Sequence, residues 1–189
     1  MTVIKIEAVT DLLCPWCYVG KKNLERAIAQ YRAIDPSAEF EVVWKPFYLS
    51  PALKSTGYDK RTIYKTYLTA LSGDFATQLT RVTSAFADAG ISLNIAGSMG
   101  NSRQAHKLLA LALRRNGPAA QNRLLETLDD ARAALDDDRT GKAVDEDVLE
   151  AKRAGITGVP TFTVQGRWRV GGNQEPDVFL RVFEKVDEA

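Results

Sequence analysis

The sequence predicts an α/β fold in which strand, helix and strand are followed by a helical insertion, a β-hairpin and a closing helix. Three observations support this order. Residues 3–9 and 40–45 are short apolar runs rich in β-branched side chains, which is typical of buried strands. The chain between them has apolar residues at helical spacing. Residues 161–170 read as two short strands joined by a tight turn.

The first helix follows the strand at residues 3–9. Its apolar side chains recur at the i, i+3, i+4, i+7 positions of a helix face, at Leu24, Ala27, Ile28 and Tyr31. Pro36 closes this unit, and Pro46 ends the second strand. A strand–helix–strand unit of this kind is expected to have a right-handed crossover.

A helical insertion is expected over residues 61–142 of a single domain that spans 1–189, with core parts at about 1–60 and 143–189. Glycines and a Gly-Pro pair divide the insertion into shorter helices, at Gly73, Gly90 and Gly117-Pro118. Asn101 and Ser102 are suited to cap one of them. Helical patterns continue over 119–128 and 129–135. The run at residues 136–138 is three aspartates, and it fits a solvated loop or helix start better than a calcium loop, which needs spaced oxygen ligands and a later Glu.

The last part of the chain supplies three further elements. A short helix is expected at about residues 146–154, before Gly155. The hairpin at 161–170 turns at Gln165-Gly166. Pro176 fits the first position of the closing helix, whose apolar stripe is Val178, Phe179, Val182, Phe183 and Val186.

Composition limits the classes of function. The chain has 189 residues, 45% hydrophobic and 26% charged, with a formal net charge of +1, which does not indicate a nucleic-acid or membrane surface. No apolar run approaches the roughly 20 residues of a membrane helix. The first strand begins at once, without the pattern of a secretory signal, so a cytoplasmic location is expected.

The only two cysteines are Cys14 and Cys17, between the first strand and the first helix. Two cysteines this close cannot stabilise a fold by closing a loop, which leaves chemistry as their role. At the helix N-cap, unpaired N–H groups and the helix dipole favour the Cys14 thiolate. Pro15 suits the first helical position. Cys14 is therefore the predicted nucleophile, and Cys17, one turn further along, the resolving thiol.

The cysteine pair has two alternative roles. Structural zinc usually has four protein ligands, and besides the two cysteines the chain offers His106 as its one histidine, so no complete Cys/His site exists and no metal is expected. Two inert buried thiols are the other alternative, which the strand–Cys-Pro-Trp-Cys–helix context disfavours.

Taken together, the motifs resemble the DsbA-like thioredoxin superfamily. They are Cys14-Pro15-Trp16-Cys17 after the first strand, the long helical insertion, and the segment 155–162 (GITGVPTF) before the hairpin. The FrnE-type branch fits best, because residues 43–51 (VWKPFYLSP), 101–106 (NSRQAH) and 172–174 (GNQ) are similar to its signature stretches. The resemblance covers essentially the whole chain.

The resemblance implies a thioredoxin-like fold, a central mixed β-sheet flanked by helices, and a cis peptide bond before Pro160. In such folds the residue before this proline, here Val159, offers its backbone to an extended substrate. Pro15 and a partly exposed Trp16 would belong to the contact surface. Asn101 and His106 open the insertion helix that the family folds over its active site, so both are predicted to bind substrate, although a packed or surface histidine is the commoner role.

Three charged residues are secondary candidates. Lys45, Glu7 and Asp11 are expected near the dithiol and could assist proton transfer to Cys17, but a solvated charge at a strand end is the commoner explanation.

The resulting functional prediction is a thiol–disulfide oxidoreductase of the DsbA/FrnE type that uses no organic or metal cofactor. Its partners would be protein or small-molecule thiols and disulfides, with glutathione as a candidate co-substrate. One alternative is a glutathione-dependent isomerase or transferase for small aromatic or polyketide-like molecules, as in the related 2-hydroxychromene-2-carboxylate isomerases and kappa-class glutathione transferases. These relatives typically have Ser at the position of Cys14. A second alternative is a non-catalytic binding or chaperone module.

The sequence also departs from the FrnE pattern. The insertion looks shortened at the junction of Leu128 and Asp129, where a few helices of the family are missing. The shortening leaves the dithiol intact. It affects the helices that the family folds over the active site, and with them the substrate specificity.

Overall fold

The computed structural model describes residues 3–55, 57–72, 74–126 and 138–187. These residues form two compact units, one made of Met1–Leu49 with Ser102–Ala189 and the other of Ser50–Asn101. The predicted helix at 129–135 and the predicted junction at 128–129 lie outside the described residues.

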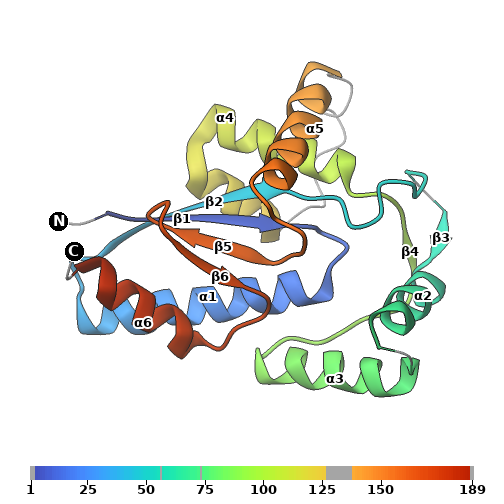
Figure 1. The fold of residues 1–189 in the computed structure, drawn as a ribbon, viewed down its shortest axis with the longest axis horizontal. Helices are drawn as coiled ribbons and strands as arrows, with labels where there is room; N and C mark the ends of the chain where they lie inside the picture. Colours follow the sequence, from blue (N-terminus) through green and yellow to red (C-terminus); the bar gives the residue numbers. More distant parts are fainter. Residues whose placement is uncertain (1–2, 56, 73, 127–137, 188–189) are drawn as a thin grey trace. The chain divides into compact units, whose positions relative to one another are not determined.

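A four-stranded mixed sheet forms the centre of the first unit (Figure 1). Its strands are β1 (Val3–Thr10), β2 (Glu39–Pro46), β5 (Thr161–Val164) and β6 (Trp168–Gly171). The spatial order is β2-β1-β5-β6, with β1 parallel to β2 and the other neighbours antiparallel. This confirms the predicted α/β class.

Helices cover both faces of this sheet (Figure 1). α1 (Pro15–Ile34) and α6 (Pro176–Asp187) lie on one face, and α4 (Arg103–Glu126) and α5 (Asp138–Arg153) lie on the other. Alternate β1 residues point toward α1 and α6, where they join a core of aromatic and aliphatic side chains, at Ile4, Ile6, Ala8, Leu24, Phe162, Phe179 and Phe183. The apolar stripes predicted for α1 and α6 thus form one core.

Two helix boundaries in the insertion can be compared with the predicted ones, the break within α4 and the start of α5. Gly117 has φ 75°, which breaks α4 into two helices at the predicted Gly-Pro position. The last helix before the hairpin begins at Asp138, well before the predicted start near residue 146. The prediction was too late because the first turns of α5 are polar and show no apolar period, although Val144 and Thr140 are both fully buried.

The second unit contains two helices and two very short strands. α2 (Lys60–Ser72) and α3 (Phe75–Asp88) are the predicted helices, and Asp74 caps α3 by accepting a hydrogen bond from the Thr77 N–H. β3 (Tyr58–Asp59) pairs with β4 (Ser98–Met99). Strands of two residues show no period in sequence, which is why they were not predicted.

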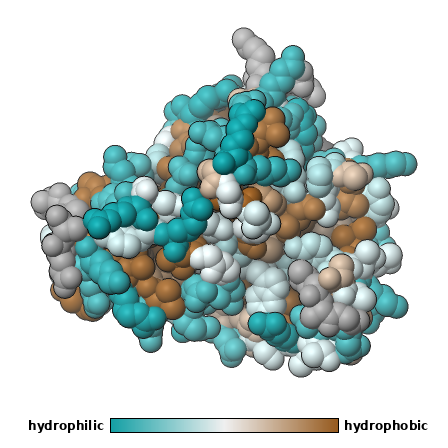
Figure 2. Space-filling view, viewed as in Figure 1, coloured by the Kyte–Doolittle hydropathy of each residue, from teal (hydrophilic) through white to brown (hydrophobic). Residues whose placement is uncertain are grey.

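Among the described residues, no helix is long and apolar enough to cross a membrane. Large hydrophobic side chains that are exposed are scattered, at Val3, Tyr18, Ile34 and Leu149. On the face shown in Figure 2, hydrophobic residues are interrupted by hydrophilic ones.

Candidate active site

Cys14 is the N-cap residue of α1, as predicted. Its backbone is extended (φ −87°, ψ 114°), and its sulfur accepts a hydrogen bond from the Cys17 N–H at 3.3 Å. Pro15 occupies the start of the helix, where a missing N–H has no cost. The N–H of Cys14 donates to the carbonyl of Asp11 at 3.0 Å, which fixes the turn that leads from β1. The Cys14 sulfur therefore lies where a helix stabilises an anion.

Cys17 lies one turn behind, and the two thiols are not bonded to each other. Burial raises the pKa of the Cys17 thiol, and the neighbouring Cys14 raises it further, while the Thr10 hydroxyl and the Asp11 N–H act in the opposite direction. The net result is a Cys17 that stays protonated. The structure thus places a protonated inner thiol one turn behind a sulfur at the helix N-cap, and the order of reaction stays a prediction.

The cis-proline loop approaches the dithiol from the far end of the chain. The Val159–Pro160 peptide bond is cis, as the family resemblance implied. The Cys14 thiol faces the carbonyl oxygen of Val159 at 3.8 Å. A cavity of about 550 Å³ lies along this loop and is lined by residues 155–161, Arg169, Gly171 and Gly172.

Gly20 allows α1 to pack closely against this loop. A Cβ at position 20 would lie 3.1 Å from Pro160 Cγ and 3.3 Å from Phe162 Cζ, which is tighter than ordinary contact. Sequence reasoning did not identify Gly20, since its role depends on a contact 140 residues away. Pro15 is buried and Trp16 is half-buried, which agrees with a partly exposed Trp16.

Asp11 connects the dithiol turn to two other elements. Its carboxylate is almost completely buried and accepts hydrogen bonds from the Leu13 N–H at 3.1 Å and the Leu49 N–H at 2.7 Å. Burial by itself would raise the pKa of Asp11, but the side chains of His106 and Ser102 and the Leu49 N–H outweigh it, so the pKa is lowered. Asp11 is therefore a buried carboxylate that stays ionised.

His106 is packed behind the dithiol turn, on the side of Asp11. It is 3% exposed, and its Nε2 atom lies 3.9 Å from the Asp11 carboxylate, too far for a hydrogen bond. This atom has no hydrogen-bond partner among the described residues. The imidazole also faces the ring of Tyr48 at 5.9 Å. His106 is thus a packed histidine in the structure, and its contact with a substrate stays a prediction.

A second polar cluster extends outward from His106 to α5. The Tyr48 hydroxyl donates to Asp145 at 2.9 Å, and Arg103 donates to the same carboxylate at 2.8 Å. Burial, followed by the Asp145 carboxylate, raises the pKa of Tyr48. Gly141 makes room for this arrangement, because a Cβ there would lie 2.5 Å from the Arg103 guanidinium.

The remaining candidates have local roles. The side chain of Asn101 donates to the Leu53 carbonyl at 2.8 Å within the second unit, so its predicted substrate contact is not tested. Lys45 and Glu7 line a small cavity of about 130 Å³ together with Asp147 from α5. In the described part of the chain, no group of three or more His, Cys, Asp or Glu side chains could hold a metal ion.

A comparison with models of protein families finds a match that covers most of the chain. The model of the DSBA-like thioredoxin domain matches residues 5–128 and 127–184. A search of curated proteins gave no match.

Two solved structures are similar over almost the whole chain. A probable DsbA oxidoreductase from Streptomyces coelicolor has a TM-score of 0.66 and 24% identity, over 96% of this chain and 89% of its own. A 2-hydroxychromene-2-carboxylate isomerase has a TM-score of 0.59 and 15% identity, over 97% of this chain and 95% of its own. Identities this low establish the thioredoxin-like fold and nothing finer.

Proposed function

Because the chain belongs to the DSBA-like thioredoxin family, we propose that it is a thiol–disulfide oxidoreductase that works through Cys14 and Cys17. The observation that carries the proposal is the Cys14 sulfur at the N-cap of α1, which accepts the Cys17 N–H at 3.3 Å. The raised pKa of the buried Cys17 supports a division of labour, with one reactive thiolate and one resolving thiol.

In the reductive direction, the Cys14 thiolate attacks one sulfur of a substrate disulfide. A Cys14–substrate disulfide forms, the substrate S–S bond breaks, and the other substrate sulfur leaves as a thiolate. Cys17 then loses its proton to solvent and attacks the Cys14 sulfur, which releases the second substrate thiolate. The substrate has gained two electrons, and the enzyme holds the Cys14–Cys17 disulfide. Oxidation of a dithiol substrate is the reverse sequence.

The Val159 carbonyl is the proposed contact for the substrate backbone. It lies 3.8 Å from the Cys14 sulfur, so a chain held there would place its own sulfur beside Cys14. A small thiol such as glutathione is the proposed co-substrate that returns the enzyme to its starting state.

An insulin-disulfide reduction assay with dithiothreitol tests this proposal. We expect Cys14→Ala to abolish the catalysed rate, because no nucleophile remains. Cys17→Ala should instead accumulate a Cys14–substrate mixed disulfide, visible by mass spectrometry under non-reducing conditions. An unchanged rate in Cys14→Ala, in a variant whose circular dichroism spectrum matches the parent, would exclude the proposal.

A glutathione-dependent isomerase is the second candidate, and the likeness of fold to 2-hydroxychromene-2-carboxylate isomerase keeps it open. An isomerase would use the thiol of bound glutathione and would not need a second protein thiol. Calorimetric glutathione binding by Cys17→Ser, with no mixed disulfide formed by the parent, would favour this candidate.

A further inference from the structure

Strand β2 lies at the edge of the central sheet, so one side of its backbone has no neighbouring strand in the described part of the chain. One backbone hydrogen bond shows which N–H groups of β2 point to that open side. The Phe47 N–H donates to the Thr10 carbonyl of β1 at 2.8 Å, so odd-numbered positions from 39 to 47 bond to β1. Because successive residues of a strand alternate, the amides of Phe40, Val42 and Trp44 point to the open side.

At Trp44 a side chain from α4 closes this open side. The Trp44 N–H donates to Gln121 Oε1 at 2.9 Å, and Gln121 Nε2 donates back to the Trp44 carbonyl at 2.8 Å. The carboxamide therefore makes the two hydrogen bonds that a peptide group of a neighbouring strand would make. The fully buried position of Gln121 indicates that this strand edge accepts an amide partner.

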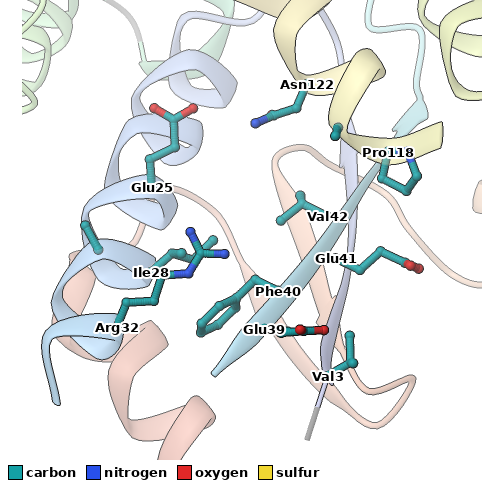
Figure 3. A pocket seen from close by; sticks show the side chains of 12 residues that line it. Val3, Glu25, Ile28, Arg32, Glu39, Phe40, Glu41, Val42, Pro118 and Asn122 are labelled. Carbon is teal, nitrogen blue, oxygen red and sulfur yellow. The ribbon is translucent and has the colours of Figure 1, made fainter. Parts of the chain in front are cut away.

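Before Trp44 the edge is open and borders a groove of about 610 Å³ (Figure 3). The groove lies between α1 and the part of α4 that follows Gly117. Its lining is Val3, Glu25, Ile28, Ala29, Arg32, Glu39, Phe40, Glu41, Val42, Pro118, Ala119 and Asn122. Among the described residues, the outward amides of Phe40 and Val42 have no hydrogen-bond partner.

The two faces of the groove differ in chemistry. Phe40 points toward α1, where it joins Ile28 and the apolar core, whereas Glu41 points away from α1 (Figure 3). Glu39 and Glu41 are exposed and form no ion pair with the described residues, while Arg32 is the single cation in the lining and lies over the Phe40 ring. The open face therefore carries the two carboxylates of Glu39 and Glu41 against one cation, Lys5 of β1, which lies in register with Glu41. The face toward α1 is apolar around Phe40, Val42 and Ile28, and the charged side chains of Glu25 and Arg32 also line it.

We propose that this groove binds an extended polypeptide segment in which apolar and basic side chains alternate, added to the sheet as a strand beside β2. In an antiparallel arrangement, residues of the segment that bond to Phe40 and Val42 would place their side chains toward Ile28, where apolar groups fit. The residues between them would lie opposite Glu39 and Glu41, where Lys or Arg forms cross-strand ion pairs. Main-chain hydrogen bonds to β2 would hold the segment, and the two faces of the groove would select its side chains.

A second copy of the chain fits this edge poorly. Two antiparallel β2 strands that pair through Phe40 and Val42 would be related by a two-fold axis at Glu41. This axis places the two Glu41 carboxylates directly opposite each other, and like charges in that position are destabilising. Pairing centred closer to the end of β2 is blocked, because Gln121 already bonds to the N–H and the carbonyl of Trp44.

The test uses the full chain with Cys14→Ser, so that peptide binding is measured without disulfide exchange. The probe is a fluorescein-labelled Val-Lys-Val-Lys-Val-Lys peptide, with affinity measured by anisotropy. Two matched peptides serve as controls, one N-methylated at alternate amides and one with Glu in place of Lys. Amide hydrogen exchange with and without the probe reports the site directly.

We expect the probe to slow exchange at Phe40 and Val42 and both control peptides to bind at least about tenfold more weakly. Glu41→Lys should weaken the probe similarly, whereas Glu184→Lys on the exposed surface of α6 should not. The proposal would be overturned if the N-methylated peptide bound as tightly as the probe, or if the probe left the amides of Phe40 and Val42 unprotected. It would also be overturned if light scattering showed that the protein dimerises and that this dimerisation causes the protection. Loss of insulin reduction by Cys14→Ser leaves this result untouched, so the two proposals fail separately.

Discussion

The two faces of the central sheet are held by different interactions. On the face of α1 and α6, phenylalanine rings pack edge to face, with Phe162 and Phe179 at a centroid distance of 5.1 Å and both fully buried. The face of α4 and α5 also buries apolar side chains, among them Val9 and Ala151. It adds side-chain hydrogen bonds, from Gln121 to Trp44 and from Arg103 to Asp145. Apolar packing is non-directional and supplies stability. Hydrogen bonds are directional, so the polar side is where strand ends and the dithiol turn are positioned.

The largest expected effect comes from the apolar face. Phe162→Ala removes a fully buried ring and leaves a cavity between β5 and α6, so the free energy of unfolding should fall by about 3–5 kcal/mol. Urea unfolding followed by circular dichroism measures it. Leu149→Ala, at a side chain that is 46% exposed, is the control and should change stability by no more than about 0.5 kcal/mol. Equal losses in the two variants would contradict this description of the core.

A smaller loss is expected on the polar face. Gln121→Leu keeps the side chain's approximate size but leaves the Trp44 N–H and carbonyl buried without partners, which should cost about 2 kcal/mol. Gln121→Glu restores the acceptor for the Trp44 N–H but not the donor for its carbonyl. The same unfolding measurement should therefore rank the parent first, the Glu variant second and the Leu variant last. A Leu variant as stable as the parent would mean that packing alone holds α4.

The smallest effect is a pH dependence that arises at Asp11. Its pKa is lowered in the folded protein, so its contribution to stability is complete above the unfolded-state pKa of about 3.9 and is lost as pH falls through the folded value. The difference in unfolding free energy between the parent and Asp11→Asn should thus shrink as pH decreases below about 4. Parallel curves for the two proteins through this range would show that Asp11 is not held ionised by its neighbours.

Local sequence patterns were sufficient for much of the fold and for the two cysteines. The β1 run, the stripes of α1 and α6 and the turn at Gln165-Gly166 each depend on residues close together in sequence. Cys14 could be assigned to a helix N-cap because the strand before it and the apolar period after it are both clear. The α/β class follows from the order of these elements.

Other features depend on contacts that no local pattern contains. Asp11 was noted as a charge near the dithiol, but its bond to the Leu49 N–H and its position against His106 arise only when β2 and α4 come together. Gly20 and Gly141 have the same origin, since each leaves space for an atom far away in sequence. The helical pattern over 119–128 does not single out Gln121, and only the open edge of β2 gives it a buried role.

The contact between Cys14 and Val159 also has a consequence for the chain as it is being made, because 145 residues separate them. At a synthesis rate of 5–20 residues per second, the second residue follows the first by about 7–30 s. During this interval both thiols exist in the cell without the loop that later covers one side of Cys14. Until Val159 has been made, the nascent protein carries both thiols without this contact, so oxidation of the two cysteines in that interval would precede completion of the fold.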